Sequence, residues 1–249
     1  MKTNMLLFLF AGFLIACQPK GSADQPDKQP EKRTADVATN PERVITDPDV
    51  GFFLDSITPP EGLSELDNAE GDLTKDGIPE RVLVYDNGKE GEYGTAREIH
   101  IYRKGQQNWE LLETIDGGVL PSLHGGVMGE PFVGITIERG CIVIEHFGGS
   151  RWKWNYTHRF RQQNDRWELI GATIYNGAPC EQSETLDYNL STGAIEFTME
   201  KMSCVGDEEQ VEKSTKTESN AKLDPLPELA GFYPGNNEVK LTANDVFFY

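Results

Sequence analysis

Residues 142–172 read IVIEHFGGSRWKWNYTHRFRQQNDRWELIGA, and this stretch predicts the fold. From Trp152 to Phe160, aromatic and imidazole side chains take every second position, and basic or polar side chains take the positions between. Alternation with a period of two indicates a β-strand with one buried face. An apolar run before Gly148 predicts a preceding strand, and the run after Arg166 predicts a following strand beyond a polar turn. The stretch is therefore predicted to form a three-stranded antiparallel meander.

The same pattern recurs upstream, where His100 stands 58 residues before His158. At this offset His100, Tyr102, Arg103, Trp109, Glu110 and Leu111 match His158, Phe160, Arg161, Trp167, Glu168 and Leu169 without a gap. We interpret the match as an internal repeat of the meander. Repeat one is predicted at about residues 63–116 and repeat two at about 131–175, with a glycine-rich loop between them.

The rest of the chain predicts an all-β body, because no stretch shows helical periodicity. Further hairpins are predicted at residues 186–201 and 238–249, and the charged, aromatic-free residues 203–228 predict an exposed excursion. Two repeats are too few to close a propeller. We therefore expect tandem antiparallel meanders, similar to propeller blades, that pack as a sandwich or an open barrel over residues 51–249.

Residues 1–16 are typical of an export signal, because their apolar run is too short for a membrane-spanning helix. The run ends at Leu14-Ile15-Ala16-Cys17, which resembles the lipobox of bacterial lipoproteins. The resemblance implies cleavage before Cys17, a covalent lipid on its sulfur and anchoring in a membrane of the cell envelope. Gln18 after the lipidated cysteine favours the outer membrane over the inner membrane.

Residues 17–50 are rich in proline and charge and contain no aromatic residue, which predicts a flexible tether. The whole chain carries a formal net charge of −18, with 41 acidic against 23 basic residues. This charge excludes binding to nucleic acid or anionic lipid by general electrostatics. It favours cationic partners, metal ions or simply solubility.

Three cysteines follow Cys17, and an exported protein with this count is expected to hold one disulfide and one free thiol. Cys180 and Cys204 are the predicted pair, because each lies just outside the hairpin at residues 186–201. Cys141 starts an apolar strand. We interpret it as a small buried hydrophobe, with a reactive thiol as the alternative.

Residues 72–80 read DLTKDGIPE and resemble the calcium loop of FG-GAP and VCBS repeats. In that pattern oxygen ligands alternate along a loop that turns sharply at a glycine, here Gly77. The ligands that the resemblance implies are the side chains of Asp72, Thr74, Asp76 and Glu80 and the carbonyl of Ile78. Threonine replaces the usual aspartate or asparagine at the third position, and glutamate replaces aspartate at the ninth. The alternative is an Asx-type turn without an ion.

One face of the predicted strand at residues 151–161 carries four basic side chains, Arg151, Lys153, Arg159 and Arg161. This face is a candidate site for an anionic glycan or a carboxylate. The alternative is ordinary sheet stabilisation by opposite charges, from Glu98, Glu145 and Glu168 on neighbouring strands.

Trp152, Trp154 and Tyr156 either stack on a sugar or pack in the core, and core packing is favoured because they share a face with Phe160. Support for catalysis is weak. His124-Gly125-Gly126 is similar to the oxyanion loop of esterases, but no Gly-x-Ser-x-Gly motif supplies a nucleophile. The histidines have no zinc-binding spacing.

Residues 66–188 resemble a family of uncharacterised bacterial lipoproteins, through the loop at 71–77 and the segments 125–132, 148–156, 160–171 and 187–189. The resemblance implies an all-β fold and no known activity. We expect a lipid-anchored cell-envelope protein that acts as a non-catalytic binding or scaffolding module for an envelope protein or glycan, with calcium as a candidate stabilising ion. The alternatives are an inhibitor or immunity-type lipoprotein that masks a cationic partner, and a hydrolase with a glycine-rich lid.

Overall fold

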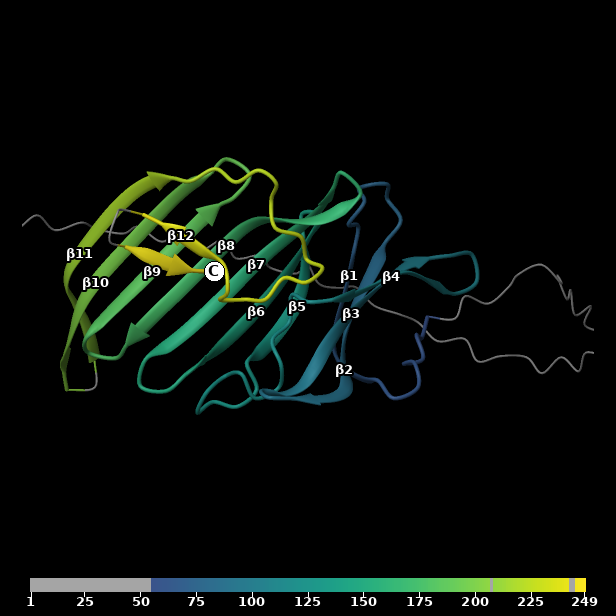
Figure 1. Ribbon diagram of the computed structural model, residues 1–249, viewed down its shortest axis with the longest axis horizontal. Helices are drawn as coiled ribbons and strands as arrows, with labels where there is room; N and C mark the ends of the chain where they lie inside the picture. Colours follow the sequence, from purple (N-terminus) through teal and green to yellow (C-terminus); the bar gives the residue numbers. More distant parts are fainter. Residues whose placement is uncertain (1–54, 207, 242–244) are drawn as a thin grey trace, which may run out of the picture. The chain divides into compact units, whose positions relative to one another are not determined.

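The computed structural model describes residues 55–206, 208–241 and 245–249 (Figure 1). These residues form β-strands, turns and loops, and no helix occurs among them. The strands are β1 (Ser64–Gly71), β2 (Glu80–Gly91), β3 (Gly94–Lys104), β4 (Trp109–Asp116), β5 (Phe132–Glu138), β6 (Cys141–Gly149), β7 (Lys153–Gln163), β8 (Arg166–Ala178), β9 (Gln182–Asn189), β10 (Ala194–Val205), β11 (Glu208–Asn220), β12 (Glu238–Lys240) and β13 (Val246–Phe248). The predicted signal peptide, Cys17 and the tether lie outside the described residues.

The strands form antiparallel sheets in which chain neighbours are also spatial neighbours. One sheet has the order β1-β2-β3-β4, and a larger sheet runs in reverse order from β11 to β5. Strands β12 and β13 pair as a separate hairpin. Figure 1 shows the strands of the larger sheet side by side in chain order. The all-β prediction with tandem meanders and no closed propeller is therefore confirmed.

The two large sheets meet where β1 lies beside β5. The backbone amide of Ile135 donates to the Asp67 carboxylate at 2.9 Å. Gly71 brings β1 close to β5, since a Cβ atom on this glycine would lie 2.7 Å from the Ile137 side chain. The edges of the two sheets therefore contact each other through the Asp67 carboxylate and through close packing at Gly71. The four-stranded and the seven-stranded sheet remain two separate hydrogen-bonded sheets.

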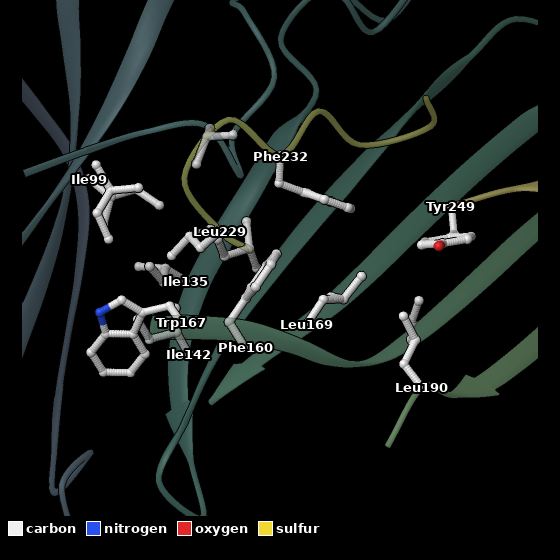
Figure 2. Packing of buried hydrophobic residues seen from close by; sticks show 14 of the residues in the cluster. Ile99, Ile135, Ile142, Phe160, Trp167, Leu169, Leu190, Leu229, Phe232 and Tyr249 are labelled. Carbon is white, nitrogen blue, oxygen red and sulfur yellow. The ribbon is translucent and has the colours of Figure 1, made fainter. Parts of the chain in front are cut away.

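The main core lies between the inner faces of the sheets. Phe160 of β7 is opposite Ile142 of β6 and Leu169 of β8, and all three are fully buried. In Figure 2, Leu229 lies between Phe160 and Ile99 of the four-stranded sheet. Burial of each large apolar side chain contributes roughly 1.5–3 kcal/mol, so this layer is the main source of stability.

The C-terminal segment completes this core over the seven-stranded sheet. The ring of Phe232 packs edge-on against Phe160, with centroids 5.4 Å apart. Tyr249 likewise packs against Tyr188 at 5.6 Å. The predicted hairpin at residues 238–249 forms as β12 and β13, and the last residues of the chain cover the inner face of the larger sheet.

The alternation that predicted β7 is confirmed for most of its length. His158 and Phe160 are buried, and Trp154 and Tyr156 are half-buried. Trp152 lies in the turn before the strand and is 44% exposed. Phe160 and Tyr156 pack in or against the core cluster, whereas Trp154 stacks on Tyr156 outside that cluster and Trp152 is exposed.

The internal repeat matches the strands but not the direction in which their side chains point. Phe160 and Trp167 pack in the main core, whereas their counterparts Tyr102 and Trp109 belong to a second cluster. That cluster lies on the outer face of the four-stranded sheet and comprises Leu83, Tyr85, Tyr102 and Trp109, with Ile57 and Leu63 packed against it. The second face of this sheet is thus also buried, by residues N-terminal to β1.

The expectation of an exposed excursion at residues 203–228 needs a correction. Strand β10 continues to Val205, and β11 forms an almost fully exposed edge strand beside it. Lys216 of β11 pairs with Glu196 of β10 at 2.7 Å. A strand solvated on both faces needs no apolar pattern, because its backbone bonds and cross-strand charges hold it to its neighbour.

Cys180 and Cys204 form a disulfide, with their Cα atoms 5.1 Å apart. Cys180 lies in the turn between β8 and β9, and Cys204 lies near the end of β10. The disulfide therefore ties the long β10–β11 ribbon back to the body of the sheet. Cys141 is buried and has a free thiol.

Candidate functional site

The loop at residues 72–80 is closed by hydrogen bonds from its own backbone. The Asp72 carboxylate accepts the amides of Asp76 and Gly77 at 3.2 and 3.0 Å, and Asp76 accepts the amide of Ile78 at 2.9 Å. Gly77 has φ of +83°, which supplies the sharp turn that the sequence predicted. The carboxylates thus point at backbone amides in the manner of an Asx-type turn.

The remaining predicted ligands of this loop are also engaged. Glu80 is fully buried and accepts the amide of Leu73 at 2.8 Å and the hydroxyl of Thr74 at 3.3 Å. The guanidinium of Arg103 pairs with Asp76. These contacts favour the Asx-type turn, the alternative to a calcium loop, because Asp72 accepts backbone amides and Arg103 pairs with Asp76. Within the described ranges, the one cluster of three potential metal-ligating side chains is Cys180, Cys204 and Glu209, whose sulfurs form the disulfide.

Calcium is therefore expected to leave the melting temperature of the full chain unchanged at millimolar concentration, compared with chelator. Asp72→Ala is expected to lower the free energy of unfolding by about 1–3 kcal/mol in either buffer, because the amides of Asp76 and Gly77 lose their acceptor. Thermal and denaturant unfolding of both proteins measure this. A calcium-dependent rise in melting temperature that Asp72→Ala abolishes would contradict the closed turn.

The four basic side chains of the predicted ligand face do not converge. Arg151 pairs with Glu181, and Lys153 contacts the Met128 sulfur at 3.5 Å. Arg159 donates to the Thr173 hydroxyl at 3.0 Å. Arg161 donates to Gln163. Arg161 lies opposite Glu168 in the β7–β8 register and is linked to it through Gln163, as the alternative of cross-strand opposite charges expects. In the described part of the chain, none of the four basic side chains forms a direct ion pair with Glu98, Glu145 or Glu168.

A different surface gathers exposed apolar side chains on three connections between strands. We call it the apolar tip, and it comprises Tyr93, Leu123, Val127, Met128 and Trp152. Val127 is 83% exposed and Leu123 is 62% exposed, which is far beyond what an apolar side chain in a core shows. These side chains lie on neighbouring connections and form a candidate interaction site, because large exposed apolar patches mark such sites in soluble proteins.

Backbone hydrogen bonds join the three connections of the apolar tip. The amide of Leu123 donates to the carbonyl of Tyr93 at 2.8 Å. The amide of Gly149 donates to the carbonyl of Gly125 at 2.9 Å, and Gly126 forms an isolated bridge with Gly149. Backbone hydrogen bonds therefore hold the three connections of the apolar tip next to one another.

A buried arginine fastens the glycine-rich loop to the four-stranded sheet. Arg97 of β3 is 6% exposed, and its guanidinium pairs with Asp86 of β2 and with Glu130 at the end of the loop. The Ser122 hydroxyl accepts the amide of Thr95 at 2.9 Å. These contacts fix both ends of the segment that presents Leu123, Val127 and Met128.

His124, the candidate for an esterase-like loop, faces aromatic rings. Its ring packs edge-on against Tyr93 at 4.6 Å and Tyr233 at 5.5 Å. Burial lowers the pKa of His124, and its Nδ1 has no hydrogen-bond partner among the described residues. A general base needs a partner that orients its ring, so this environment suits packing better than catalysis.

Sequence reasoning missed both the apolar tip and the role of Arg97. Exposed apolar residues in a loop carry no periodicity, and a single arginine in a strand does not reveal its partners. The glycines of the loop at 117–131 were the available signal, because they indicate close backbone approach.

Comparisons with protein-family models, with curated proteins and with solved structures found no match. In the described part of the chain, no helix is long and apolar enough to cross a membrane.

Proposed function

We propose that this chain is a lipid-anchored, non-catalytic binding module of the bacterial cell envelope, and that the apolar tip is its contact surface for an envelope protein. The observation that carries the proposal is the high exposure of Leu123 and Val127 on a loop whose ends are fixed. A preformed loop loses little conformational entropy on binding, and apolar anchors at its apex supply binding energy. The lipobox-like sequence at Cys17 supports the anchor and the envelope location.

The contacts of the loop favour this proposal over a hydrolase with a glycine-rich lid. A lid needs ends that can swing, whereas Arg97 and Ser122 hold this segment at both sides. The net charge of −18 keeps the second alternative, an inhibitor that masks a cationic partner, as a competing proposal. The two proposals predict different contact surfaces. A binding module would use the apolar tip, whereas an inhibitor of a cationic partner would use surface carboxylates.

A photo-crosslinking residue at position 123 of the full chain, expressed in its own bacterium, tests the proposal. The matched control places the same residue at Val205, which is 64% exposed against 62% for Leu123 and is the last residue of β10, outside the residues of the tip. We expect one adduct of defined mass from position 123 and none from position 205. Val127→Asp should reduce that adduct about tenfold or more, because a charge replaces an apolar anchor. Equal adducts at both positions, or indifference to Val127→Asp, would argue for chance collision.

A further inference from the structure

The outer face of the seven-stranded sheet contains a hollow of about 700 Å³ that spans β7 to β11. The Arg159 side chain lies over Gly171, since a Cβ atom on this glycine would be 3.7 Å from Arg159 Cδ, and Ala194 adds only a methyl group to the lining. Arg139 and Arg159 stand on its wall, together with Asp187 and Asn189. Its volume falls within the range of sites that hold small molecules.

Two guanidinium groups at this hollow form no ion pair with a carboxylate of the described residues, a property that they share with Arg161 outside the hollow. Each of the arginines at positions 81, 97, 103, 151 and 166 forms an ion pair with a carboxylate. Arg159 instead donates only to the Thr173 hydroxyl, and the Arg139 side chain forms no hydrogen bond or ion pair with a described residue. The chain has 41 acidic and 23 basic residues, so unpaired arginines are not explained by a shortage of carboxylates.

The hollow also carries negative charge, which is kept apart from the arginines. The Thr173 hydroxyl accepts from Arg159 at 3.0 Å and contacts the Asp187 carboxylate at 3.4 Å. One hydroxyl therefore separates a cation from an anion that could otherwise pair. The other two acids of the wall, Glu196 and Glu218, share Lys216 at 2.7 and 3.8 Å. Asp187 is thus the acid of the wall that forms no ion pair with a described residue.

We propose that this hollow binds a small zwitterion of the α-amino acid type, free or at the end of a short peptide. Arg139 and Arg159 would receive the carboxylate through charge-assisted hydrogen bonds, for which a guanidinium fork is well shaped. Asp187 would receive the ammonium group, and the space over Ala194 would hold the side chain. The site is separate from the apolar tip and needs no partner protein.

Isothermal titration of the full chain with L-alanine, propionate and ethylamine tests the proposal, because the last two each lack one charged group of alanine. We expect saturable binding of alanine and binding at least about tenfold weaker for either half-molecule. Arg159→Gln and Asp187→Asn should each weaken alanine binding about tenfold or more. The matched control is Arg161→Gln, on the same face of β7 but outside the hollow, which should change nothing.

Three results would overturn the proposal: no alanine binding, propionate binding as tight as alanine binding, or equal effects of Arg159→Gln and Arg161→Gln. Alanyl-alanine forms a further arm. Tighter binding of the dipeptide would identify a peptide end as the occupant, and weaker binding would identify the free amino acid. Unfolding curves of the variants separate lost binding from lost folding.

Discussion

Replacing Arg97 by methionine is expected to lower the free energy of unfolding by about 1.5–3 kcal/mol, because the partly exposed carboxylates of Asp86 and Glu130 lose a buried charged hydrogen-bond donor. Arg97 is 6% exposed and holds two carboxylates, Asp86 and Glu130. Burial acts to raise the pKa of Asp86, but hydrogen bonds from Thr95, Gly88 and Arg97 outweigh it and lower that pKa. The carboxylate is therefore charged at neutral pH and would stay charged without its partner. Denaturant unfolding measures the loss.

Arg166→Met is the matched control for Arg97→Met. Arg166 also pairs with a carboxylate, Glu228, but both side chains are largely exposed at 49% and 40%. An exposed pair contributes at most about 1 kcal/mol, so the control should lose much less. Equal losses in the two variants would show that burial of the Arg97 network has no special weight. Arg97→Met should also weaken crosslinking from the apolar tip, because Glu130 no longer fastens the loop.

Lowering the pH from 7 to 5 is expected to remove about 4 kcal/mol of stability through two buried histidines. Burial, with a smaller effect from the nearby His124, lowers the pKa of His146 to about 3. Burial also lowers the pKa of His158 to about 3, with smaller effects from His146 and Arg159. Both pKa values start from an ordinary value of 6.5.

The sign of the effect follows from these depressed values. The folded protein keeps both imidazoles neutral while the unfolded chain binds protons below pH 6.5, so stability is complete above that pH and falls as the pH drops towards 3. Each imidazole contributes about 2 kcal/mol of loss by pH 5. The groups around His158 are Tyr156, Phe160 and Phe232, none of which is acidic. Protonation therefore finds no compensating carboxylate there.

His158→Leu separates this effect from the titration of the many surface acids. Neither ring nitrogen of His158 has a hydrogen-bond partner in the described residues, so leucine removes no bond and should halve the acid-dependent loss. His100→Leu is the contrasting variant. Its ring contacts Glu98 at 2.7 Å and Tyr102 at 3.3 Å, and its loss should cost about 1–3 kcal/mol already at pH 7. An unchanged pH slope in His158→Leu would show that this histidine is solvated in the fold.

The alternation of apolar and polar residues predicted the strands in which one face is buried and the other is exposed to solvent. The alternation from Trp154 to Phe160 and the two strands beside it show this, as does the hairpin at residues 186–201. It could not show which sheet face a repeat would bury. His100 and His158 match in sequence, yet one lies on the outer face of its sheet and the other in the main core. The four-stranded sheet is covered on both faces. The alternation of residue types along its strands therefore does not tell which face points to the main core.

The hollow and the charged edge were beyond sequence reasoning for a related reason. Arg139 lies in a turn and meets Arg159 only because β6 and β7 pair in this register. The acidic and basic residues of β11 predicted solvent exposure, and the strand is almost fully exposed. They could not predict a strand, because an exposed edge strand and an exposed loop can have the same composition. Contacts set by register are visible only in the folded chain.

The second apolar cluster has a mechanical consequence. Ile57 and Leu63 cover the outer face of the four-stranded sheet, and the Asp55 carbonyl accepts from Arg81 at 2.9 Å. Residues 55–63 form a strip along this face. A force applied to the chain before residue 55 therefore acts first on the contacts of this strip. Because the strip does not enter the main core, we expect it to separate from the sheet at a lower force than the core needs to open.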